Sequence, residues 1–494
     1  MWLAGIHRSI PYTRPGIGVL AMNVARRIGA NMVAAVGGKA IIALTGVATV
    51  AIMTRQLGVA DYGVLRTALT FVLFPATFAN LGLNYIMLRE VGVETVRADR
   101  IVSAALGLRL TAGALFLAAG LGISLLIPWS PIVRWTILIA SIGMLAYIGN
   151  EIITGVLQWQ LRQELAIVAE VVGAAVTLAG VVLATKLGLG VLSMAAVSTV
   201  GFLLTFLLAW ALAGRLRSVR PIVDKEIWWQ LVRPGLPLAA SAWFTLVSLR
   251  GDTLLLSLLK PAAEVGFYGV ATKIYEVGLQ LPILFGGLLM PLFARSANDP
   301  RQLRTQVTAA LHVLVVVGIA IVLGLGFFAR DIVVLLAGPA FIPSTAAVQI
   351  AGMSLALAGC TAALRYAAVA QGRQMRLMAL DGVTGVLAVI TYLILIPSLS
   401  FIGAAIGTLV VEIVMLISLS MLVGKGVGGI PWPTHLVRTL LAGLLAAAGI
   451  ALLHETSLPV WAVGSFAILI YAGLLMLTGA LTVSQLRAVL VTGP

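Results

Sequence analysis

Cysteine is almost absent from the sequence: Cys360 is the only one, and it lies in an apolar run. A single cysteine forms no intramolecular disulfide and provides no Cys-based metal site. The four histidines, His7, His312, His435 and His454, are scattered without an HExxH or other ligand spacing. Neither residue type therefore predicts a metal ion or a cofactor.

Charged residues are also few. Asp, Glu, Lys and Arg make up 10% of the 494 residues, whereas soluble domains carry about 25%. Hydrophobic residues make up 61%, and the mean hydropathy is +1.10. Because an apolar run of about 20 residues crosses the ~30 Å hydrocarbon core as a helix, the composition predicts an all-α polytopic membrane protein. A nucleic-acid partner is not expected, despite a net charge of +15.

The apolar runs predict about fourteen transmembrane helices. They lie at 29–53, 62–88, 101–127, 132–156, 164–185, 189–213, 234–259, 266–293, 306–328, 344–368, 376–397, 401–423, 438–454 and 459–481. We expect a cytoplasmic segment over 1–28, an N-lobe of six spans over 29–213 and a cytoplasmic inter-lobe loop over 214–233. A C-lobe of six spans over 234–423 and an extra helix pair with a short tail over 424–494 complete the predicted chain.

The Lys and Arg residues of the loops are unequally divided between the two sides of the membrane. Fourteen spans put both chain ends on one side, together with most of these residues. The other side has only Arg55, Arg134, Lys186, Lys260 and Arg330. Since loops rich in Lys and Arg face the cytoplasm, we expect a multi-pass protein of the cell membrane with both termini in the cytoplasm.

Motifs of common membrane enzymes are missing. The sequence has no GxxxxGK[ST] phosphate loop and no serine nucleophile elbow. A membrane glycosyltransferase or polymerase needs an acidic residue in a sizeable outer loop. The acids predicted on the outer side lie in short turns: Asp61, Glu264, Asp331 and Glu455. These absences favour a carrier over an enzyme.

Two stretches of the chain share one plan, in which two apolar runs with internal charges are joined by a short turn. The first turn covers 58–66 (GVADYGVLR). Within it, 60–63 (ADYG) aligns with 266–269 (GFYG), and the closing glycines, Gly63 and Gly269, are 206 residues apart. We therefore expect two halves of the same topology, related by an axis along the membrane normal.

Basic residues occur inside the predicted spans at matching places in the two halves: Lys39 and Arg66 in the first, Arg250 and Lys273 in the second. Ionisable groups at that depth are buried, paired or on a substrate path. Cations in a cavity attract an anionic head group, so these four are the candidate substrate-binding residues. Two structural roles stay open as well: Lys273 can pair with Glu276, three residues on, and Arg66 can extend to the membrane interface.

Six further charged residues of the spans are candidates for ion coupling or for structural ion pairs. They are Asp252, Glu276, Arg109, Glu151, Glu170 and Glu412. Arg109 is predicted at a depth where it could pair with either Glu151 or Glu170. Glu412, midway along its span, has no evident partner in the sequence.

Two of these stretches carry a family resemblance. Residues 26–72 (RRIGANMVAAVGGKAIIALTGVATVAIMTRQLGVADYGVLRTALTFV) resemble the opening of Wzx-type polysaccharide flippases. Residues 250–277 (RGDTLLLSLLKPAAEVGFYGVATKIYEV) are similar to the start of that family's second half. The family is part of the multidrug/oligosaccharidyl-lipid/polysaccharide exporter (MOP) superfamily, and the likeness covers nearly the whole chain.

The resemblance implies two six-helix lobes in a V shape around a cavity lined by spans 1, 2, 7 and 8. It implies transport of a polyprenyl-diphosphate-linked oligosaccharide to the outer leaflet, for lipopolysaccharide or exopolysaccharide export, by alternating access of the lobes. Lys39, Arg66, Arg250 and Lys273 would then bind the diphosphate and acidic sugars. The implied partners are the lipid-linked glycan, membrane lipids, a polysaccharide polymerase and other assembly proteins.

Two related functions stay open. A lipid II flippase, which moves a peptidoglycan precursor, shares the architecture and the cationic cavity. A multidrug/cation antiporter of the same superfamily is expected to have a cavity dominated by acids. The basic residues in spans 1, 2, 7 and 8 argue against that antiporter.

Overall fold

The structure, a computed structural model, describes residues 17–80, 82–93, 95–430, 432, 435–454 and 459–480. Most of the predicted N-terminal segment, with Arg8 and Arg14, lies outside these ranges, as do Glu455 and the end of the predicted tail. Every regular element in the described ranges is a helix, which confirms the predicted all-α class.

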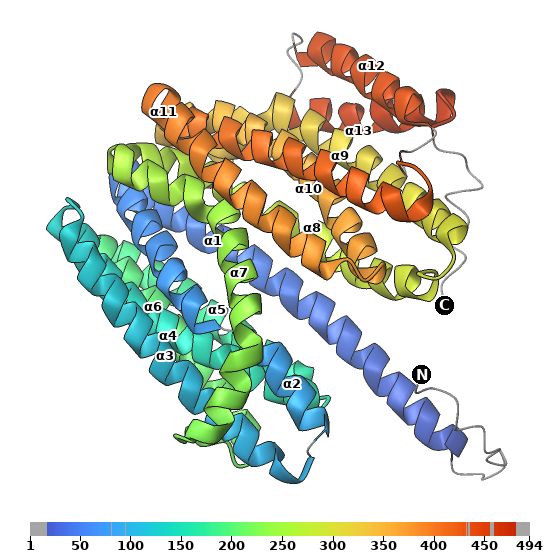
Figure 1. Cartoon of the computed structure of the whole chain (residues 1–494). Helices are drawn as coiled ribbons and strands as arrows, with labels where there is room; N and C mark the ends of the chain where they lie inside the picture. Colours follow the sequence, from blue (N-terminus) through green and yellow to red (C-terminus); the bar gives the residue numbers. More distant parts are fainter. Residues whose placement is uncertain are drawn as a thin grey trace.

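The helices follow one another along the chain as Figure 1 shows. The first half has α1 (Ile17–Asn80), α2 (Leu83–Val93), η1 (Thr95–Arg97), α3 (Ala98–Leu126), α4 (Pro131–Trp159), α5 (Gln163–Lys186) and α6 (Val191–Gly214). The second half has α7 (Lys225–Leu259), α8 (Ala262–Arg295), α9 (Pro300–Ala337), η2 (Pro339–Ser344), α10 (Thr345–Ala370) and α11 (Gln374–Val427). The last helices are α12 (Leu436–His454) and α13 (Val460–Leu477).

Eleven helices of the described ranges are long and apolar enough to cross a membrane. Two of them, α1 and α11, bend at a single residue of non-helical geometry, Gly58 and Ser400, so each holds two of the predicted spans. Helix α13 is a shorter apolar helix. The other nine long helices, the four arms of α1 and α11, and α13 together match the fourteen predicted spans.

The turns of the repeat are shorter than the sequence predicts. Within α1 only Gly58 (φ 70°) leaves helical geometry, and the chain between α7 and α8 is Lys260 and Pro261. The motifs at 60–63 and 266–269 therefore lie inside helices, and the predicted turn over 58–66 is wrong. In lipid each unpaired backbone group is costly, so a reversal over one or two residues is favoured. Glycine adopts a positive φ without the penalty of a Cβ.

Glycines of the repeat bring the backbones of α1 and α8 into contact. A Cβ on Gly63 would lie 1.7 Å from the carbonyl oxygen of Ala262. A Cβ on Gly266 would lie 2.0 Å from the carbonyl oxygen of Val59. Only glycine allows so close an approach between two helices. The two halves of the chain thus meet where their repeated motifs begin.

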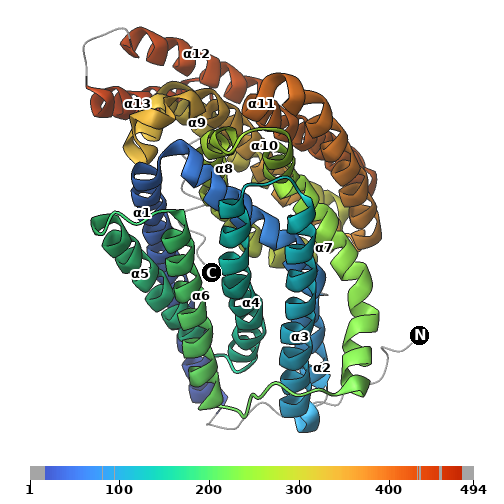
Figure 2. The same cartoon turned by 90° about the vertical axis from the view of Figure 1, so that its left-hand side faces the viewer.

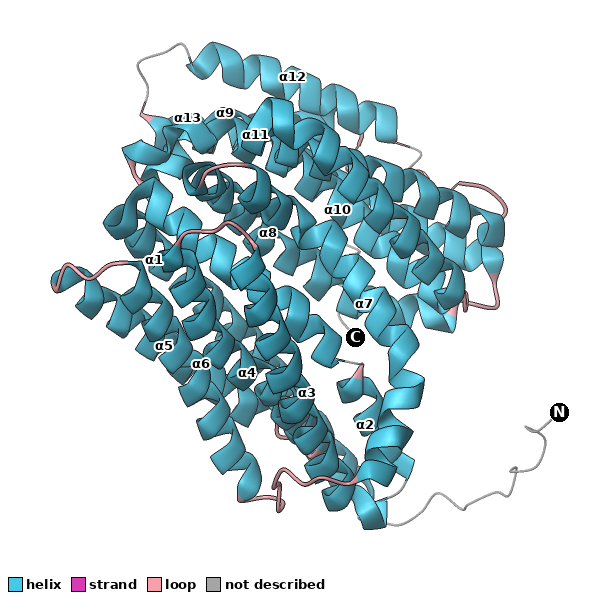
Figure 3. Ribbon diagram, turned by 60° about the vertical axis from the view of Figure 1, so that its left-hand side comes forward, coloured by secondary structure: helices cyan, strands magenta, loops and turns pink. Residues whose placement is uncertain are grey.

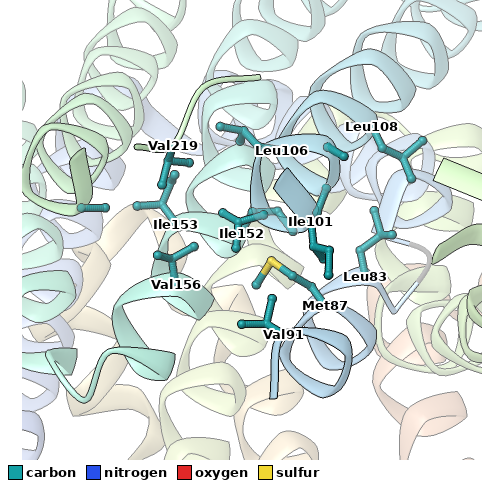
Figure 4. Packing of buried hydrophobic residues seen from close by; sticks show 14 of the residues in the cluster. Leu83, Met87, Val91, Ile101, Leu106, Leu108, Ile152, Ile153, Val156 and Val219 are labelled. Atoms are coloured by element: carbon teal, nitrogen blue, oxygen red, sulfur yellow. The ribbon is translucent and has the colours of Figure 1, made fainter. Parts of the chain in front are cut away.

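The helices gather into two bundles, with α3 to α6 in one and α8 to α11 in the other (Figures 1 and 2). Helices α12 and α13 pack on α9 through an apolar cluster that includes Leu323, Ala446 and Tyr471. Loops lie at the helix ends (Figure 3). In the first bundle, side chains of α2, α3 and α4 interlock around Met87, Leu106 and Ile152 (Figure 4).

Helix α7 connects the two bundles. It begins at Lys225, so residues 225–233 of the predicted loop are helical. Asp224 caps α7 by accepting a hydrogen bond from the backbone N–H of Ile227, and this bond lowers the pKa of Asp224. The guanidinium of Arg100 in α3 lies 2.6 Å from the same carboxylate. At its other end α7 packs against α11, where the Tyr392 hydroxyl lies 3.2 Å from the carbonyl oxygen of Ser248.

We expect Gly63→Ala to separate α1 from α8, because its methyl group has no space beside Ala262. Overpacking of this kind costs about 1–3 kcal/mol. The measurement is the midpoint of thermal unfolding of the protein in detergent. Gly122→Ala is the matched control, since nothing lies within 4 Å of a Cβ on that helical glycine. An equal midpoint in both variants would contradict the close contact.

Candidate functional site

Three basic side chains converge on the carboxylate of Glu276. Arg66 Nη2 lies 2.9 Å from Oε1, and Arg250 Nη1 donates to the same oxygen. Lys273 Nζ, one helical turn away, lies 3.4 Å from Oε2. The four residues come from the second arm of α1, from α7 and from α8. We call them the Glu276 cluster, and it holds three cations and one anion.

Arg66 is the member of the cluster that comes from the first half of the chain. Its side chain is 12% exposed, and its Nη2 also donates to the hydroxyl of Thr272 at 2.9 Å. Gly269 makes room for it, since a Cβ there would lie 2.9 Å from Arg66 Cγ. Arg66 therefore points to a partner in the second half rather than along the surface to the interface.

A cavity of about 310 Å³ lies beside the cluster, among α7, α8, α10 and α11. Arg250, Glu276 and Asp252 line it, and so do Arg365 and Asp381. The last two form an ion pair of 2.6 Å between α10 and α11. The cavity therefore has charged groups of both signs in its walls.

Asp252 is buried in a network of hydroxyl groups. The hydroxyl of Tyr268 donates to its Oδ2 at 2.6 Å, and Thr408 of α11 lies 3.2 Å from the same oxygen. Asp252 and Arg250 are two residues apart on α7 and contact different partners, Tyr268 and Glu276. Tyr268 belongs to the repeated motif, but the sequence assigns no role to its hydroxyl.

Glu412 has partners that the sequence did not indicate. The hydroxyl of Tyr275 lies 3.0 Å from Oε1, and that of Thr361 lies 3.3 Å from Oε2. Hydroxyl groups are common in membrane helices. Their spacing along the chain therefore carried no signal for either contact.

The other candidate charges in the first half of the chain form two separate ion pairs. Lys39 lies 2.6 Å from Glu170 of α5, and its side chain is 53% exposed. Buried Arg109 pairs with Glu151, which selects one of the two partners predicted for it. Of the four candidate cations, the structure thus brings together Arg66, Arg250 and Lys273, while Lys39 pairs elsewhere.

Arg109 also holds the end of α1. It donates to the carbonyl oxygen of Ala79 and to Oδ1 of Asn80, each at 2.9 Å. The carbonyl group of Ala79 lies in the last turn of α1, where backbone carbonyl groups have no hydrogen-bond partner within the helix. Arg109 therefore joins α3 to the end of α1 and to α4 through these contacts.

Long apolar helices in two bundles, with ion pairs between them, are typical of a polytopic membrane protein in which the charges within the spans mark a candidate functional site. The family described as "Polysaccharide biosynthesis protein" matches residues 28–297, which is more than half of the chain. The chain belongs to this family, which confirms the family-level resemblance read from the sequence. A search among curated proteins found no match.

Solved structures show the same fold. A "Lipid II flippase MurJ, inward closed conformation" is 14% identical, with a TM-score of 0.76, and the match covers 93% of this chain and all of that one. An inward-facing multidrug resistance MATE family transporter is 18% identical, with a TM-score of 0.64, covering 78% and 95%. A MOP superfamily transporter from Pyrococcus furiosus is 16% identical, with a TM-score of 0.57, covering 81% and 95%.

We expect Arg109→Met to destabilise the protein by about 1–3 kcal/mol, because it leaves acceptors of the buried guanidinium, among them the carbonyl oxygens of Ala79 and Ile148, without a donor. Arg89→Met is the control, since the Arg89–Glu90 pair lies at the surface and such pairs contribute at most about 1 kcal/mol. Thermal unfolding in detergent compares the two. A similar shift in both variants would show that Arg109 does not anchor α1.

Proposed function

We propose that the protein flips a polyprenyl-diphosphate-linked oligosaccharide from the inner to the outer leaflet for cell-surface polysaccharide biosynthesis. The observation that carries this proposal is the Glu276 cluster, in which cations from both halves of the chain surround one anionic group. Membership of the polysaccharide biosynthesis family supports a glycan as the cargo.

The chemistry of the cluster fits a diphosphate. Guanidinium groups grip phosphate oxygens with paired N–H donors, while a lysine ammonium acts as a mobile point charge. We propose Arg66, Arg250 and Lys273 as the residues that bind the diphosphate. Lys39, which is half exposed beside Glu170, is the fourth proposed cation. A charged site of this kind binds the polar head group while the prenyl chain stays in lipid.

Transport would proceed by alternating access between two lobes, residues 29–213 and 234–423. The contacts at Gly63 and Gly266 would close the outer side in this conformation, and rocking of the lobes would open it. Both termini would lie in the cytoplasm, as the distribution of Lys and Arg suggests.

A lipid II flippase is the second candidate, favoured by the fold shared with MurJ over the full length of that chain. Lipid II also carries a diphosphate, so the same cations would serve both substrates. The assay below therefore includes lipid II as a separate substrate.

We expect wild-type protein in proteoliposomes to flip a labelled polyprenyl-diphosphate oligosaccharide, and Arg250→Ala and Lys273→Ala to reduce the rate at least about tenfold. Each variant removes one charge–phosphate contact in a region of low dielectric. Lys186→Ala is the control, because Lys186 is an exposed cation at the end of α5.

Full transport by both folded variants would contradict the role of these cations. Transport of lipid II alone by the wild type would replace the proposed substrate. No transport of any diphosphate lipid by the wild type would overturn the proposed class of substrate.

The orientation has its own test. In a Cys360→Ala background, Ser218→Cys should react with a membrane-impermeant maleimide only after the cells are opened, because residue 218 lies on the proposed cytoplasmic side. Gly190→Cys lies between α5 and α6 on the proposed outer side of the membrane, so it should react in intact cells. Both positions are exposed in the structure. The reverse pattern would invert the proposed topology.

A further inference from the structure

The carboxylate of Glu276 occupies the position at which the cations of its cluster would hold a ligand. Oε1 accepts bonds from Arg66 and Arg250, and Oε2 faces Lys273. All three cations of the proposed diphosphate site are therefore directed at an anion that the protein itself supplies. A diphosphate entering this site has to compete with that carboxylate.

The net charge of the cluster attracts such an anionic competitor. Three cations and one carboxylate leave two positive charges without a counter-charge in the cluster, so the cluster attracts a diphosphate esterified at both ends, which carries two negative charges. Arg66 also has donor capacity left: its Nε is buried and without a hydrogen-bond partner among the described residues. An unpaired buried donor is costly, and a phosphate oxygen would satisfy it.

The Glu276 carboxylate also connects the two halves of the chain. It lies on α8, and its partner Arg66 lies on the second arm of α1, 210 residues away in the sequence. Each of the other two cations shares the second half with Glu276. A ligand that takes Arg66 away from Glu276 therefore removes an ion pair between the halves.

We propose that Glu276 is an internal competitor of the substrate. It neutralises the cations in the empty transporter, is displaced when the anionic head group binds, and returns to the cations to expel the head group after flipping. This inference rests on the proposed function, because it takes the diphosphate as the ligand. It adds a residue that sets affinity and release without itself binding the substrate.

The proposal predicts opposite effects on affinity and on turnover. Without the negative charge in Glu276→Gln, inorganic pyrophosphate should bind the detergent-solubilised full chain about tenfold or more tightly, since one repulsive charge is removed in a poorly hydrated site. Flipping of the labelled diphosphate oligosaccharide at saturating substrate should be slower by a similar factor, because no carboxylate displaces the head group. A carboxylate that only stabilised the fold would lower both affinity and rate when removed.

Two further variants separate the charge from the fold. Glu276→Asp keeps the charge and should restore turnover toward the wild-type value. Glu264→Gln makes the same substitution on the same helix, where Glu264 contacts the hydroxyl of Ser400 and no member of the cluster. It should leave pyrophosphate affinity and turnover unchanged. Circular dichroism and thermal unfolding verify that each variant is folded.

The contact between the two halves can be followed by pulsed electron paramagnetic resonance. Spin labels are attached to Phe78→Cys of α1 and Leu281→Cys of α8 in a Cys360→Ala background, and the distance between them is measured. Both positions are exposed. Pyrophosphate should change the distance distribution of the otherwise unmodified protein. Glu276→Gln should show the changed distribution before pyrophosphate is added.

The outcomes distinguish this inference from the proposed function. If the wild type flips the glycan but folded Glu276→Gln binds pyrophosphate no more tightly, the internal competitor is refuted and the function stands. If the wild type neither binds pyrophosphate nor flips any diphosphate lipid, both fall together. Tighter binding with slower turnover supports both.

Discussion

An ionised carboxylate between apolar helices needs cations around it, and Glu276 has three of them. Because unpaired charge at membrane depth is costly, this interaction constrains where α1, α7 and α8 lie relative to one another. The helices that supply the cations are the first ones of each half, and these helices also carry the repeated motif. The pairing of charge and the meeting of the two halves are therefore one structural feature.

Small residues make that arrangement sterically feasible. Gly63 and Gly266 let α1 and α8 touch through their backbones, and Gly269 leaves room for the stem of Arg66. The long side chain of Arg66 can then run along α8 past Thr272 to Glu276, which lies about one helical turn further on. The glycines of the repeat thus position a charge as well as a helix crossing.

The other buried charged residues either form ion pairs between helices or accept hydrogen bonds from hydroxyl groups in the cavity wall. Arg109 with Glu151 fixes the end of α1, and Arg365 with Asp381 joins α10 to α11. Asp252 and Glu412 are held by hydroxyl groups instead of cations, in the walls of the cavity beside the cluster.

Run length, composition and local motifs are properties of neighbouring residues. The membrane class, the fourteen apolar segments, the internal repeat and the family could therefore all be predicted from the sequence. The sequence also placed the charges in the spans, but it did not identify their partners. That Lys39 pairs with Glu170, and that Arg66, Arg250 and Lys273 share Glu276, became evident in the folded chain. Those pairs join residues as far as 210 positions apart, and their geometry depends on helix packing that no local pattern encodes.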